Sequence, residues 1–72
     1  MAKKPRYQQQ LFAVIRFDEG VATPEHAFSV KEVTTDLALA EAEAERLNRL
    51  NEEKKSHYFV QSTRLFDPEA NR

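Results

Sequence analysis

Two histidines are the residues of this sequence that come closest to catalytic or metal-binding chemistry. His57 is the best single candidate for general acid–base work, because imidazole titrates near neutral pH; the nearest carboxylate along the chain is Glu53. His26 follows Glu25, and together they could supply two metal ligands, fewer than a stable zinc site needs. We therefore interpret His57 as an exposed or half-packed strand residue. The sequence predicts no enzyme, catalytic residue, metal or cofactor.

Two arginines suggest a different chemistry, that of nucleic-acid binding. Arg16 and Arg64 each lie near aromatic residues, in segments expected to form neighbouring strands. A sheet that displayed Phe12, Arg16, Tyr58 and Arg64 would resemble a platform on which single-stranded nucleic acid stacks its bases. The formal net charge of -1 and the lack of a glycine-containing aromatic RNA-binding segment argue against it. Nucleic-acid binding is therefore the alternative function.

The composition limits the chain to one small domain and excludes several classes of site. The 72 residues contain no cysteine and a single glycine, so disulfides, thiolate metal sites and glycine-rich phosphate loops are excluded. The longest apolar stretch, Leu11–Ile15, is far too short to span a membrane. We expect a cytoplasmic protein without a membrane partner.

Segments rich in β-branched and aromatic residues predict the strands that would position any site. Leu11–Phe17 is the first strand, and a turn-forming segment that contains Gly20 follows it. A second strand runs from about His26 to Val33, with a bulge near Lys31–Glu32 that would bring its apolar residues to one face. His57–Phe66 is the last strand.

One helix lies between the second and the last strand. Thr34, Thr35 and Asp36 are residues that cap helix N-termini, and the helix should run to about Lys54. Its apolar stripe ends at Asn51, whose side chain we expect to bond carbonyl groups of the last turn or the neighbouring strand. The remaining members of the stripe are Leu37, Ala40, Ala44 and Leu47.

These elements predict an α+β domain with the order β-β-α-β. The most apolar strand, the first, belongs in the centre, which gives a three-stranded sheet of order 2-1-3 with the helix on one face. Residues 1–10 are expected to form a flexible basic and polar arm, residues 11–66 the domain, and residues 67–72 a disordered tail.

A single helix cannot cover both faces of this sheet, and the first strand is apolar on both. If its odd-numbered residues meet the helix, Phe12 and Val14 point away from it, beside either Tyr58 and Val60 or Phe59 and Leu65. An exposed patch of this kind usually marks an interaction site. The leading prediction is therefore a binding or assembly module that forms a homodimer, or binds another protein, through the open face or an edge strand. Two alternatives are that the chain's own N-terminal arm or C-terminal tail covers this patch, or that a foreign ligand does.

Five residues are predicted to form the contact surface: Phe12, Val14, Arg16, Tyr58 and Arg64. The helix–strand segment Arg46–Asn51, with Lys54 and then Tyr58–Leu65, resembles the C-terminal half of small uncharacterised bacterial proteins of about this length. The resemblance implies a bacterial source and supplies no activity or site residue.

Overall fold

The computed structural model describes the backbone of residues 6–67 and the side chains of residues 9–66. It contains three strands and two helices, which lie in the order of the chain as follows: β1 (Arg6–Asp18), α1 (Pro24–Ala27), β2 (Phe28–Thr34), α2 (Leu37–Leu50) and β3 (Ser56–Asp67).

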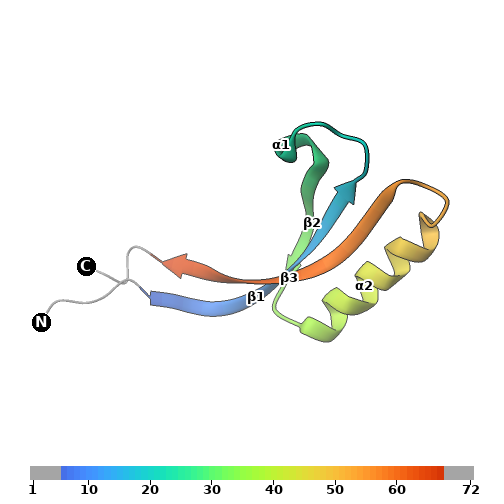
Figure 1. Ribbon diagram of the computed structural model, residues 1–72. Coiled ribbons are helices and arrows are strands. Elements are labelled where there is room, and N and C mark those ends of the chain that lie inside the picture. The colour runs from blue at the N-terminus through green and yellow to red at the C-terminus, as the bar shows by residue number, and fades with distance from the viewer. Residues whose placement is uncertain (1–5, 68–72) are drawn as a thin grey trace, which may run out of the picture.

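The strands form one sheet of order β2-β1-β3, as predicted. Strand β1 is antiparallel to both neighbours, so β2 and β3 run in the same direction on either side of it. Helix α2 connects them and lies along one face of the sheet (Figure 1). The predicted α+β class and 2-1-3 order are therefore confirmed.

Strand β1 is longer than the sequence indicated. It begins at Arg6, because residues 6–10 pair with the end of β3, where Gln10 lies opposite Arg64 and Arg6 opposite Asp67. This pairing satisfies backbone groups that a flexible arm would leave to water. Since β2 pairs only as far as Phe12, β1 and β3 continue alone as a two-stranded ribbon (Figure 1). The rest of the predicted arm and tail, residues 1–5 and 68–72, lies outside the described residues.

Strand β2 begins two residues later than predicted, at Phe28. The preceding residues form the short helix α1, which has Pro24 in its first turn, where a missing amide donor costs nothing. The predicted bulge is present: Val14 lies opposite Glu32 and Ile15 opposite Val30, so that Lys31 is the extra residue.

Helix α2 begins where predicted and ends earlier than predicted. The Asp36 side chain accepts a hydrogen bond from the Leu39 amide at 3.2 Å, which satisfies one orphan donor of the first turn. The helix ends at Leu50, and Asn51 Nδ2 donates to the Leu47 carbonyl oxygen at 2.8 Å, as expected for this residue. Residues 51–55 form turns that lead into β3.

The hydrophobic core lies between α2 and the sheet, and it is small. Val14, Ala40, Ala44 and Tyr58 are buried, and Val14 is the largest side chain that is completely buried. Phe12, Leu47 and Val60 pack partly exposed around them. The small residues of the helix let it approach the sheet closely, but the core that results holds few large apolar side chains.

Candidate interaction surface

The helix covers the face of the sheet that we expected to be open. Val14 is 0% exposed and Tyr58 is 7% exposed, and both pack against the helix residues Ala40 and Ala44. The register explains this, because Val14 lies opposite Val60 on β3 and cross-strand partners share one face. The prediction that Phe12 and Val14 form an exposed contact was therefore wrong: the helix takes the even-numbered positions of β1.

The predicted platform of aromatic and arginine residues does not form one exposed surface. Phe12 and Tyr58 lie under the helix. Arg16, opposite Tyr58, donates from Nε to Asp18 Oδ1 at 2.9 Å, whereas Arg64 lies opposite Gln10 in the ribbon. The two arginines are thus on the same face but separated by the covered core.

The open face carries the odd-numbered positions of β1 and their cross-strand partners. Ala13 is buried by its neighbours on this face, and Leu11, Ile15 and Phe17 are half-buried. The outer strands contribute large apolar side chains that keep 40% to 60% of their surface exposed: Phe28, Val30, Val33, Phe59 and Leu65. Their exposed surface is on the order of 400 Å², which is the size of the largest apolar patch on a typical monomeric protein, and such a patch is often functional.

The bulge in β2 keeps charge off this face. Because Lys31 is the extra residue, Lys31 and Glu32 both belong to the helix side, while Val30 and Val33 stay on the open side. The charges act accordingly. The pKa of Asp18 is lowered mainly by the Ser56 hydrogen bond, with the smallest contribution from Lys31, and the pKa of Arg46 is raised mainly by the Glu43 hydrogen bond, with the smallest contribution from Glu32. A regular strand would have turned either Val30 or Val33 away from the open face.

One end of the open face is aromatic, and His57 and Glu19 form an ionisable pair there. The Phe17 ring lies 4.9 Å from the Phe28 ring and 6.3 Å from the imidazole of His57, centroid to centroid. His57 Nε2 contacts the Glu19 carboxylate. His57 thus packs as a strand residue, as interpreted from the sequence, and pairs with a carboxylate of the β1–α1 loop rather than with Glu53.

A polar cluster ties the ends of β1 and β3 together on the other side of the sheet. The Ser56 hydroxyl donates to Asp18 Oδ1 at 2.5 Å, and Arg16 donates to the same oxygen. The Ser56 hydrogen bond, followed by that of Arg16, holds the pKa of Asp18 below its ordinary value of 3.8. The Glu19 amide also donates to the Lys55 carbonyl oxygen at 2.8 Å.

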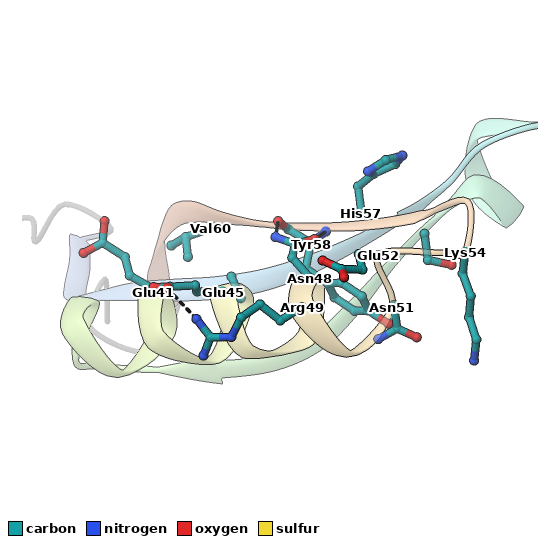
Figure 2. Close-up of a pocket in the computed structure, with 12 residues that line it drawn as sticks. Glu41, Glu45, Asn48, Arg49, Asn51, Glu52, Lys54, His57, Tyr58 and Val60 are labelled. Atoms are coloured by element: carbon teal, nitrogen blue, oxygen red, sulfur yellow. Dashed lines mark hydrogen bonds and ion pairs between the residues drawn. The ribbon is translucent and has the colours of Figure 1, made fainter.

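A groove runs between α2 and the outer edge of β3 (Figure 2). Asn48 spans it: its Oδ1 accepts from the Tyr58 amide and its Nδ2 donates to the Tyr58 carbonyl oxygen, both at 2.8 Å. Glu41 and Val60 line the groove farther along, and Arg49 donates to Glu45 at 2.6 Å on its helix side. The sequence pattern singles out Asn51, and no sequence signal indicated that Asn48 would bind a strand backbone.

Comparison with known proteins returns no relative of this chain: no family model, curated protein or solved structure matches it. The resemblance to small bacterial proteins therefore stays a prediction. Within residues 6–67, no helix is long and apolar enough to cross a membrane. In the same part of the chain, no three His, Cys, Asp or Glu residues are grouped to hold a metal ion, so Glu25 and His26 gain no third ligand.

Proposed function

We propose that this chain is a non-enzymatic assembly module that acts in the cytoplasm and self-associates by burying its open sheet face against the same face of a second copy. The single observation that carries the proposal is the row of apolar side chains on that face, 40% to 60% exposed and supplied by both outer strands. The absence of cysteine from the sequence supports the cytoplasmic assignment.

A second copy fits this face because the face is complementary to itself. Two sheets pack about 10 Å apart when apolar side chains interdigitate between them. Within residues 9–66, His57 is the only charged or ionisable residue among the open-face positions of the strands, so over this stretch two such faces meet without other opposed charges. Gln9, Gln61 and Thr63 supply a polar rim, which is typical of protein interfaces.

The area is that of a small interface. The exposed apolar side chains supply about 400 Å² on each copy, so the face-to-face contact buries about 800 Å² in total, which is the size of a weak contact that forms at micromolar concentration. Association costs about 4–15 kcal/mol in lost freedom of motion. The small internal core adds a reason for association, since chains near this size often need a partner to reach ordinary stability.

Sedimentation equilibrium from low to high micromolar concentration tests the proposal. Val30→Asp places a charge among the apolar side chains of the open face, on a side chain that is 60% exposed in the single chain. We expect it to raise the dissociation constant of the face-to-face contact at least a hundredfold, because the contact would bury an unpaired carboxylate.

Leu39→Asp is the matched control. Leu39 is 62% exposed but lies on helix α2, away from the open face, so its replacement should leave the association unchanged. A wild-type chain that stays monomeric at high micromolar concentration would refute the proposal. So would a Val30→Asp variant that associates as tightly as Leu39→Asp.

A further inference from the structure

The two outer strands of the sheet differ in how well their free edges are protected against pairing. Strand β2 is short, and it carries the bulge and the charged residues Lys31 and Glu32, all of which discourage edge pairing. Strand β3 has 12 residues, pairs only with β1 among the described strands, and contains neither proline nor lysine. Its outer edge is therefore a template for another strand.

Asn48 defines where the available part of this edge begins. Because its carboxamide bonds both the amide and the carbonyl of Tyr58, these groups point away from β1. Backbone groups alternate in direction along an antiparallel strand, so those of Val60, Ser62 and Arg64 point outward as well. Asn48 occupies the place of a neighbouring strand at Tyr58, and the stretch that we infer to be available for pairing runs from Val60 to Arg64.

We infer that this edge pairs antiparallel with β3 of a second copy, centred on Ser62. This contact lies on a different surface from the open face and goes beyond the proposed function. Centring on Ser62 sets Val60 opposite Arg64 of the second copy, so that the pairing stops before Tyr58, where the backbone groups are already bonded to Asn48. On the open face the same register sets Phe59 opposite Leu65 of the second copy, which forms an apolar cross-strand pair.

Charge complementarity favours a second copy as the occupant. Glu41 lines the groove beside Val60, at the same end of the close-up in Figure 2. Within the described part of the chain, neither Glu41 nor Arg64 forms an ion pair. A residue opposite Val60 on an added strand lies under this flank of the helix, so Arg64 of the second copy would meet Glu41. Because the two copies are related by a two-fold axis, the Glu41–Arg64 ion pair would form twice.

Edge pairing leaves the open face available. Antiparallel strands of one sheet are related by a two-fold axis perpendicular to it, so both helices lie on one side and both open faces on the other. Edge pairs that also stack face to face form a closed tetramer. The wild-type chain should therefore be a tetramer at high micromolar concentration, with two kinds of contact that can be removed separately.

Native mass spectrometry and sedimentation of four chains test this: wild type, Val30→Asp, Ser62→Pro and the double variant. Ser62→Pro removes an outward-pointing amide and leaves the β1–β3 ladder intact; Ser62→Val keeps the amide and is its control. We expect the wild type to be a tetramer, each single variant to be a dimer and the double variant to be a monomer. Circular dichroism should show that each chain is folded. A monomeric Val30→Asp chain would overturn edge pairing but not face pairing. A Val30→Asp chain with wild-type mass would overturn face pairing instead.

Charge reversal tests the register in the Val30→Asp background, where only the edge contact remains. Glu41→Arg or Arg64→Glu alone should raise the dimer dissociation constant about tenfold, because two ion pairs become two repulsive contacts. The combination of both substitutions should restore the original constant. Single and combined variants that bind equally well would overturn the Ser62-centred register.

Discussion

The side chain of Asn48 and the backbone of Tyr58 form a two-membered ladder between helix α2 and strand β3, with both hydrogen bonds at 2.8 Å. The carboxamide has the donor and acceptor arrangement of a peptide group, so it satisfies the edge strand as a neighbouring strand would. It also fixes the position of the helix along the sheet, because one turn of α2 is tied to one residue of β3.

Replacement of Asn48 by alanine should lower the free energy of unfolding by about 1–3 kcal/mol, since two partly buried groups of Tyr58 lose their partner. Urea denaturation measures the change. Arg49→Ala is the control: its ion pair with Glu45 is exposed, and its loss should cost less than about 1 kcal/mol. Equal effects of the two substitutions would contradict the role given to Asn48.

The contact between α2 and the sheet depends on small residues. Ala40 is completely buried against the core, so Ala40→Leu should force the helix away from Val14 and lower the free energy of unfolding by about 1–3 kcal/mol. Thermal unfolding followed by circular dichroism checks this. Ala38→Leu, an exposed position on the same helix, should change stability by less than about 0.5 kcal/mol. A stabilised Ala40→Leu variant would show that the interface has spare volume.

Strand order, the bulge and the helix N-cap could all be predicted because each has a local signal. The bulge follows from the parity of Val30 and Val33, and the cap from Asp36 before an apolar stripe. The choice of covered face has no such signal, because β1 is apolar on both sides. It depends on the β1–β3 register, and the contact that accompanies this register, Ser56 to Asp18, joins residues 38 positions apart in the sequence.

One face of the sheet is left without a helix, as predicted, but it is the opposite face from the one expected. The odd-numbered side of β1 has more apolar residues than the even-numbered side, so burial alone favoured it for the helix. The structure instead places Tyr58 under Ala40 and Ala44, where a large ring fills the space that small helix residues leave. Leu11, Ile15 and Phe17 are left to the open face, where only their cross-strand neighbours cover them.

The Asp18 carboxylate should make stability depend on pH in the acid range. Its pKa is lowered by the Ser56 hydroxyl and by Arg16, so the folded state favours the ionised form. The stabilisation is complete above the ordinary pKa of 3.8 and is lost as the pH falls through the lower pKa of the folded state. Asp18→Asn should therefore be less stable than wild type at pH 6, and the difference should shrink below pH 4.

Urea midpoints of the two chains between pH 6 and pH 2.5 test this prediction. Glu43→Gln is a useful comparison, because the Arg46 hydrogen bond lowers the pKa of Glu43, a half-buried carboxylate of helix α2. A constant difference between wild type and Asp18→Asn across the range would show that loss of the carboxylate shape, and not of its charge, is responsible.

Two single-residue deletions in β2 separate the role of the bulge from that of its residues. Deletion of Lys31 removes the extra residue and keeps Val30 opposite Ile15 and Glu32 opposite Val14, so the open face and the self-association should persist. Deletion of Ser29 makes Phe28 and Val30 adjacent, and neighbours on a strand point to opposite faces. One of them must leave the open face, so association should weaken at least tenfold by sedimentation. Equal losses from both deletions would contradict this register.

The pairing of Arg6 with Asp67 has a mechanical consequence. These two residues lie side by side at one end of the sheet's longest ladder. Tension applied between them is therefore directed along the inter-strand hydrogen bonds, perpendicular to the strands. The bonds would then break one after another, as in a zipper, and little force should be needed to peel β3 from β1. A chain anchored through both ends would yield first at the ribbon, before the helix-covered part of the sheet experiences any load.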